Sequence, residues 1–269
     1  MTDRRTTMTD RPITRRRALA MSAGAFVGMA GCLGGPETDG AARDADGGDG
    51  FALDIDDSVS VDIDLAAYDT TEQDGVDVPL APIEDTYDWY RSGGARFVDA
   101  RGGGQYESER IEGAVLSPAP DGDGEEPDPV DDWDTDDVIV TYCDCPHHLA
   151  AARAADLVQN GHENVAVIDE GFVPWVENGY PTAGEETGEA GSVWTVAGVT
   201  DPSFAGDLAW GVHEATDQQE AVPIADDGTF EMTIRFSGLT DDTELVVETP
   251  ASRTERPIGE LAAETIYLD

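Results

Sequence analysis

A strand, a loop, a helix and a second strand follow one another in the middle of the chain, and this order constrains the fold more than any other feature. Residues 138–142 are a continuous, largely β-branched run, which is typical of a strand buried on both faces. An alanine-rich segment with one apolar stripe follows; Gly161 is placed to end this helix, and residues 165–168 form a second buried run. The order predicts an α/β domain with a parallel sheet and helices on both of its faces.

The loop between this strand and the helix carries the most reactive side chains of the chain. Cys143 and Cys145 are two of the three cysteines in the sequence, and His147 and His148 are two of the four histidines. Cys143 directly follows the strand, and functional residues of parallel sheets gather beyond the carboxyl ends of their strands. The amides and the dipole of the following helix favour a thiolate at this point. We therefore predict that Cys143 is a nucleophile; the alternative is a buried structural cysteine.

Segments on either side of this loop resemble the signatures of a known family. Residues 97–114 contain Phe-Val-Asp-Ala-Arg, then Gln-Tyr, then Ile-Glu-Gly-Ala. Residues 140–143 resemble a catalytic strand that ends in cysteine, and residues 171–181 resemble a closing motif with Gly, Trp, Gly, Tyr and Pro. In this order and spacing the motifs resemble those of the rhodanese family, over about residues 76–185.

The resemblance implies a sulfurtransferase. Cys143 would attack the outer sulfur of a donor such as thiosulfate, carry it as a persulfide, and pass it to a thiol or to cyanide. No cofactor is implied beyond that transient persulfide. Asp99 and Arg101 would support the loop as an ion pair. The residues implied in the substrate-binding loop are Asp144, Cys145, Pro146, His147, His148 and Leu149.

Three loop positions depart from the family pattern, which runs Cys-x-x-Gly-x-Arg and then a small hydroxyl residue. Pro146, His148 and Leu149 stand at those positions. Proline has no amide hydrogen to donate to the sulfur, and histidine is a cation only below its ordinary pKa of about 6.5. We therefore expect the loop to hold anionic thiosulfate less firmly than the family's loop does.

Three other functions remain open for this loop. Cys145 could resolve a persulfide or sulfenate on Cys143, which would make the pair a redox switch. The two thiols together with His147 and His148 could bind zinc or copper. Neighbouring residues point in divergent directions, so we predict no metal site. The domain could also be a non-catalytic binding module of the rhodanese fold.

The charge of the chain excludes some partners. It has 58 acidic residues against 15 basic ones, every basic residue is Arg, and the formal net charge is -43. Such a surface repels the phosphates of nucleic acids, so we expect no nucleic acid partner. Concentrated salt would screen the self-repulsion of this surface. The composition resembles that of haloarchaeal proteins, and we expect a halophilic protein.

The first 32 residues differ from the rest of the chain and predict export. Arg15, Arg16 and Arg17 precede a weakly apolar run and resemble a twin-arginine signal. The run ends in small residues before Cys32, which resembles a lipobox. We therefore expect a lipoprotein at the cell surface, attached through Cys32 to the outer face of the cytoplasmic membrane. The alternative is an uncleaved membrane span.

Composition divides the remainder into three parts. Residues 33–58 are rich in Gly, Asp and Ala and predict a flexible acidic linker. We assign residues 59–187 to the rhodanese-like domain. Its first segment, residues 59–65, alternates between apolar and polar residues and predicts an edge strand or an extended arm. We interpret the acidic stretch at residues 118–137 as a surface loop. Residues 190–269 carry short alternating segments between turns, which predict a small all-β, sandwich-like module. We expect that module either to bind a partner protein or to act as a spacer.

Overall fold

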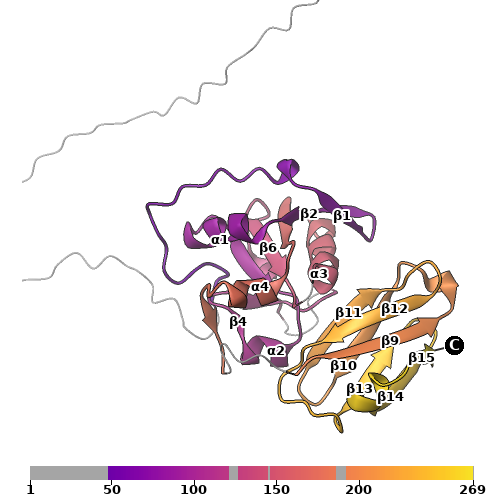
Figure 1. Cartoon of the computed structure of the whole chain (residues 1–269). Helices are drawn as coiled ribbons and strands as arrows, with labels where there is room; N and C mark the ends of the chain where they lie inside the picture. Colours follow the sequence, from indigo (N-terminus) through magenta and orange to yellow (C-terminus); the bar gives the residue numbers. More distant parts are fainter. Residues whose placement is uncertain (1–47, 121–126, 145, 186–191, 269) are drawn as a thin grey trace, which may run out of the picture. The chain divides into compact units, whose positions relative to one another are not determined.

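The computed structural model describes residues 48–120, 127–144, 146–185 and 192–268 (Figure 1). The chain divides into two units, Met1–Ala41 and Ala42–Asp269, and every described residue belongs to the second unit. The predicted export signal with Cys32 lies outside the described residues, and so does Cys145. Within the described ranges no helix has the length and apolarity needed to cross a membrane.

A six-stranded sheet forms the centre of the α/β domain. β1 is antiparallel to its neighbour, and the other four pairs of neighbouring strands are parallel. The predicted parallel sheet is therefore confirmed, with one antiparallel strand added at its edge. In spatial order the strands are β1 (Thr70–Gln73), β2 (Val76–Ala81), β7 (Asn164–Ile168), β6 (Val138–Tyr142), β3 (Arg96–Asp99) and β5 (Val115–Leu116).

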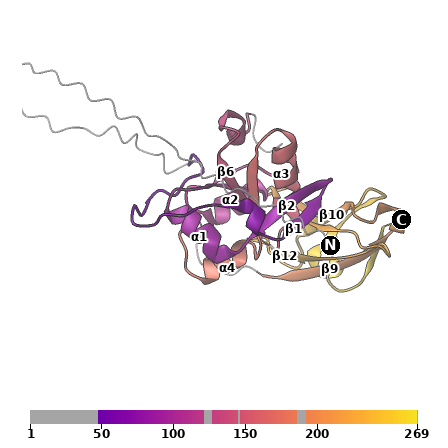
Figure 2. The same cartoon turned by 90° about the horizontal axis from the view of Figure 1, so that it is seen from above.

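Helices cover both faces of this sheet. Successive side chains of a strand point to opposite faces, and neighbouring apolar residues of β6 therefore pack against different helices. Ile139 of β6 packs in one apolar cluster with α3 (His148–Gln159). Its neighbour Val140 packs in a second cluster with α1 (Ile83–Arg91) and α4 (Phe172–Glu177). Figure 2 shows α1 and α4 together, with α3 apart from them. The predicted βαβ unit is thus formed by β6, α3 and β7.

Short elements connect β3 to the rest of the domain. α2 (Gly103–Ser108) follows β3 and leads into β4 (Arg110–Ile111). β4 pairs antiparallel with β8 (Thr182–Ala183), which closes the domain after α4. α2 therefore lies directly after the end of β3, near the carboxyl edge of the sheet.

The predicted linker ends earlier than Ser58, because residues from Gly48 onward pack against the α/β domain. Gly50 donates its amide to the Gly113 carbonyl (3.2 Å) and accepts a bond from the Phe97 amide of β3 (2.7 Å). A Cβ atom on Gly48 would lie 2.0 Å from the Gly113 oxygen, so this approach requires glycine. Gly48 and Gly50 therefore serve close backbone packing.

The alternating segment at residues 59–65 forms an extended arm and not a strand. Val61, Ile63 and Leu65 are half-buried and pack against the cluster that contains α1. The arm leads into the 3-10 helix η1 (Leu65–Ala67) before β1 begins. The sequence allowed an edge strand or an extended arm here, and the structure has the extended arm.

The predicted acidic surface loop is partly buried over residues 127–137. The 3-10 helix η2 (Pro129–Asp132) buries Val130. Asp128 accepts a hydrogen bond from the guanidinium of the buried Arg153. A buried Arg requires a carboxylate partner, and this stretch supplies it, so its acidic residues are not all solvated.

Residues 192–268 form two further sheets that share one core. Val196 and Met232 of the three-stranded sheet pack in a single cluster with Leu245 and Val247 of the four-stranded sheet. The predicted β region is confirmed, and one short helix, α5, lies among its strands. The four-stranded sheet has the order β11 (Gln218–Pro223), β10 (Leu208–His213), β13 (Glu244–Glu248), β14 (Arg253–Pro257); the three-stranded sheet has β12 (Thr229–Ile234), β9 (Trp194–Thr200), β15 (Ile266–Leu268); η3 (Pro202–Phe204) and α5 (Ile258–Leu261) connect strands.

Candidate active site

β6 delivers Cys143 to the carboxyl edge of the parallel sheet. Cys143 directly follows Tyr142, the last residue of the strand, and its exposed fraction is 0%. Its carbonyl accepts a hydrogen bond from the Phe172 amide at the start of α4 (2.8 Å). Cys143 belongs to the apolar cluster that contains α3, which begins at His148. The thiol therefore lies between a strand end and a helix start, where the sequence placed it.

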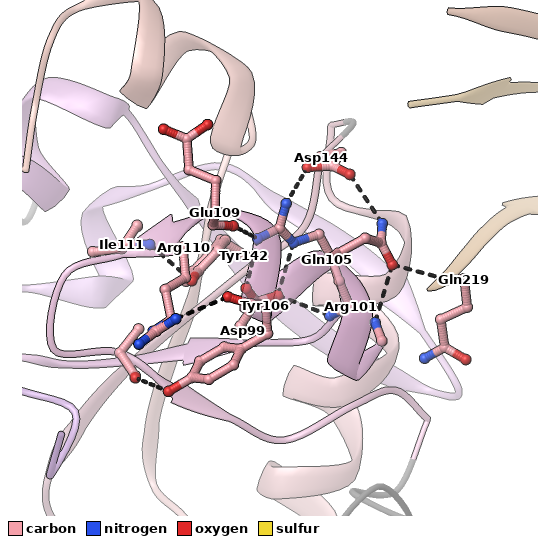
Figure 3. Close-up of polar contacts among 12 residues, drawn as sticks. Asp99, Arg101, Gln105, Tyr106, Glu109, Arg110, Ile111, Tyr142, Asp144 and Gln219 are labelled. Carbon is pink, nitrogen blue, oxygen red and sulfur yellow. Dashed lines mark hydrogen bonds and ion pairs between the residues drawn. The ribbon is translucent and has the colours of Figure 1, made fainter. Parts of the chain in front are cut away.

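Asp99 ends β3, the neighbour of β6, and its carboxylate binds Arg101. Arg101 donates from Nε and Nη2 to the two Asp99 oxygens (2.9 and 2.7 Å), and from Nη1 to Asp144 Oδ1. Nη2 also donates to the Glu109 carbonyl (2.6 Å). Figure 3 shows the guanidinium between the two carboxylates. Because Asp144 directly follows Cys143, Arg101 holds the residue next to the thiol.

Burial and charge act in opposite directions on Arg101. Burial by itself lowers its pKa, but the carboxylates of Asp144 and Asp99 outweigh that effect and raise the pKa well above its ordinary value. The guanidinium also lies 4.4 Å from the centre of the Phe172 ring. Burial, and then the Asp99 charge, raise the pKa of the Tyr142 phenol well above 10.0. Beneath the loop, Arg101 is therefore a permanent cation and the Tyr142 phenol is neutral.

Gln105 of α2 completes the polar cluster beneath the loop. Its Nε2 donates to Asp144 Oδ2 (3.0 Å), so both carboxylate oxygens of Asp144 have a partner (Figure 3). Gln105 and Asp144 are both buried. A buried carboxylate is stable only when it is paired and hydrogen-bonded, and here both conditions are met.

The remaining residues of the predicted loop have different surroundings. Pro146 is exposed, whereas Leu149 is fully buried in the cluster around α3. His147 adopts a left-handed backbone conformation with φ of 50°. Its Nδ1 lies 3.5 Å from Asp169 Oδ1, beyond β7. In the middle of the loop Pro146 is thus exposed and His147 half-buried, whereas Asp144 and Leu149 at its two ends are buried.

His148 stands where the family carries Arg, and its surroundings disfavour a positive charge. Burial, and then the neighbouring His147, lower the pKa of its imidazole below 6.5. The side chain also forms a hydrogen bond with the Ala221 backbone of β11. At neutral pH this position therefore presents a neutral ring that is bonded to the β-module.

No group of three or more His, Cys, Asp or Glu side chains capable of holding a metal ion is present among the residues that the structure describes. Cys145, one of the four ligands considered from the sequence, lies outside those residues. The rings of His147 and His148 are 6.0 Å apart and inclined by 71°. His148 bonds the β11 backbone, so the two rings have separate partners.

A family model described as "Rhodanese-like domain" matches residues 83–178, from the first turn of α1 to the end of α4. The chain contains a rhodanese-like domain. Asp99, Arg101, Cys143 and Asp144 all lie inside this domain. The β-module lies outside the matched residues, so the match describes the α/β domain alone.

Three solved structures are similar to part of the chain. The BH2092 protein from Bacillus halodurans is 24% identical over 40% of this chain and 77% of its own, with a TM-score of 0.35. The rhodanese-like domain of the Alr3790 protein from Anabaena sp. is 20% identical over 40% of this chain and 80% of its own, also with a TM-score of 0.35. A crystal structure of the Alr3790 protein is 20% identical over 39% and 91%, with a TM-score of 0.33. No curated protein matches the chain.

Sequence reasoning placed Gln105 in a motif without assigning it a contact, and it missed Gln219 entirely. The signal for Gln105 was its position four residues after Arg101 in a motif that resembles the family's. The sequence carries no comparable signal for Gln219, which lies in a polar stretch of the β-module. The Gln219 amide donates to Gln105 Oε1 (2.8 Å), so the β-module contributes to the surroundings of the loop.

Proposed function

We propose that the protein is a rhodanese-like sulfurtransferase that carries sulfane sulfur as a persulfide on Cys143. The observation that carries this proposal is the position of Cys143 at the carboxyl end of β6, inside the matched domain. Arg101 and Gln105 support it by holding Asp144, the next residue of the loop. A fixed loop after the nucleophile suits a reaction that depends on the position of one sulfur atom.

The proposed reaction has two balanced steps. The Cys143 thiolate attacks the outer sulfur of thiosulfate; a new S–S bond forms, the S–S bond of the donor breaks, and sulfite leaves with the electron pair. A thiolate or cyanide then attacks the outer sulfur of the persulfide. The persulfide bond breaks, thiocyanate or a new persulfide leaves, and the Cys143 thiolate is restored. No metal or organic cofactor takes part in these steps.

Export and anchoring form part of the same proposal. The twin-arginine-like leader and Cys32 support a lipoprotein on the outer face of the cytoplasmic membrane. The charge of -43 supports work in concentrated salt. Mass analysis of the mature N-terminus would test the anchor: a lipid-modified cysteine derived from Cys32 is expected, and an intact leader in the membrane fraction would contradict it.

Persulfide mapping tests the chemistry. The protein is incubated with thiosulfate in about 2 M KCl, where its surface charge is screened. The peptide that contains Cys143 should gain the mass of one sulfur atom and lose it on addition of cyanide, with thiocyanate as product. Cys145→Ser is the matched control and should still load Cys143. A Cys143→Ser variant that continues to form thiocyanate at the wild-type rate would refute the proposal.

A second candidate function is a non-catalytic binding or redox-sensing module that uses Cys143 and Cys145. The complete burial of Cys143 favours a binding function over sulfur transfer, because a sulfur donor must reach a residue whose exposed fraction is 0%. The redox-sensing function rests instead on the presence of the second thiol, Cys145. Under this function no donor loads sulfur onto Cys143 in the folded protein. Oxidation with mild peroxide would instead link the two cysteines, which peptide mapping under non-reducing conditions detects.

A further inference from the structure

Three consecutive glycines allow the β-module to approach α2 closely. A Cβ atom on Gly102 would lie 2.2 Å from the Asp217 carbonyl oxygen, and one on Gly104 would lie 1.8 Å from the Thr216 carbonyl oxygen. In this contact the Gly104 amide donates to the Asp217 carbonyl (2.9 Å), and the Gly103 amide donates to the Asp217 carboxylate (3.0 Å). The turn before β11, at Thr216 and Asp217, therefore packs directly on the backbone of the three glycines.

Gln105, the next residue of α2, connects this contact to the loop that bears the thiol. Its Oε1 accepts from the Gly102 amide (3.2 Å) and from the Gln219 amide of β11 (2.8 Å). Two amide donors identify this atom as the oxygen, so Nε2 is the group that faces Asp144 (Figure 3). Gln105 is only 3% exposed, and each end of its amide has a partner.

The loop that follows Cys143 thus has support from β11 at both of its ends. At one end, Asp144 receives the Gln105 amide, whose oxygen is held by β11. At the other end, His148 bonds the Ala221 backbone of the same strand. Neither contact involves Cys145, and both link the Cys143 loop to a part of the chain outside the residues that match the family model.

We propose that Gln105 is a positioning residue through which docking of the β-module fixes the conformation of the Cys143 loop. The proposal rests on the proposed sulfurtransferase function, and it assigns the β-module a role in that reaction. Gln105 does not contact the reacting sulfur atoms in this role. It orients Asp144, and through Asp144 the backbone that follows the thiol.

Two variants of Gln105 in the full chain test this role. Gln105→Met keeps the volume but removes both ends of the amide, so the loop should loosen at every pH. The loss of a hydrogen bond to a charged group predicts about a tenfold rise in the rate at which iodoacetamide labels Cys143, read by peptide mapping. Persulfide loading should fall by a similar factor. Gln159→Met is the matched control, because this exposed side chain at the end of α3 donates to the Asp74 carbonyl (3.3 Å) and not to β11 or Asp144.

Gln105→Glu adds a dependence on pH that a merely structural role would not produce. When protonated, the introduced carboxyl can donate to Asp144, as the amide does; when ionised, it repels Asp144. The other charged groups on the elements around it are Arg101, which favours ionisation, and Asp217 and Glu220 of the β11 side, which oppose it. Labelling of this variant relative to wild type should therefore rise with pH, whereas that of Gln105→Met should not change with pH.

Gly104→Ala tests the coupling from the side of the β-module. The added methyl group would force the turn at Thr216 away from α2 without altering Gln105, so it should raise Cys143 labelling in the same direction as Gln105→Met. The proposal is overturned if Gln105→Met and Gly104→Ala, both folded by circular dichroism, label Cys143 within twofold of wild type. Because labelling requires no sulfur donor, a wild-type protein that fails to load sulfur would refute the proposed function and leave this test intact.

Discussion

Arg101→Met is the substitution whose cost follows most directly from the structure. The Arg101 side chain is buried and donates to Asp99, Asp144 and the Glu109 carbonyl. Methionine retains the length and apolar bulk of arginine but carries no charge. The variant would therefore leave two buried carboxylates, at Asp99 and Asp144, without their cation.

Removing one partner of a buried ion pair costs about 3–5 kcal/mol, because the remaining charge stays desolvated. We expect this loss in the free energy of unfolding of the α/β domain. Arg91→Met is the matched control. Arg91 pairs with Asp88, but their side chains are 40% and 47% exposed, and such surface pairs contribute about 0–1 kcal/mol.

The assay follows hydrogen exchange in peptides from β3 and β6 during urea unfolding, so that the α/β domain is measured separately from the β-module. Salt provides a second criterion, because buried pairs are screened much less than surface pairs. The loss caused by Arg101→Met should be equal in about 1 M and about 3 M KCl. The reasoning is wrong if Arg101→Met destabilises the domain no more than Arg91→Met does.

Two further predictions concern the loop and its helix. Because burial lowers the pKa of His148 in the folded protein, the unfolded chain binds the proton first as pH falls through about 6.5, and stability is lost below that pH. His148→Gln should reduce this loss of stability, measured by urea titrations between about pH 7.5 and 5.5. The same dependence of the unfolding free energy on pH in the variant and the wild type would contradict this prediction. Burial also lowers the pKa of His162, so His162 accounts for part of the pH dependence that the variant retains. Leu149→Ala should cost about 2–5 kcal/mol, because it opens a cavity at a fully buried site. Val158→Ala, at a partly buried site on the same helix, should cost clearly less, and equal losses would show that the site around Leu149 collapses.

The centre of the fold was predictable because its signals are local. The β-branched run that became β6 and the apolar stripe of α3 each report burial within a few residues. Gly161 adopts φ of 106° directly after the helix, the conformation for which glycine is preferred at a C-terminus. The position of Cys143 followed from these two elements, since it is the first residue after one and precedes the other.

Contacts that join distant parts of the chain could not be predicted in the same way. The hydrogen bond between Gln219 and Gln105 joins residues 114 positions apart, and the local sequence around a polar strand residue does not indicate its distant partner. Asp128 lies in an acidic stretch typical of solvated loops, and only its contact with the buried Arg153 shows otherwise. The glycines near Gly50 predicted flexibility by composition, whereas their use is close backbone packing, which composition does not distinguish.

β11 lies at an edge of the four-stranded sheet, and this position gives the Gln105 contact a second consequence. The amide of Gln219 points away from the neighbouring strand β10 and bonds the Gln105 side chain. Exposed edge strands are templates on which other chains add strands and aggregate. By occupying an outward-facing amide of β11, α2 protects this edge from such pairing. We therefore expect a chain whose β-module separates from α2 to lose solubility as well as support for the Cys143 loop.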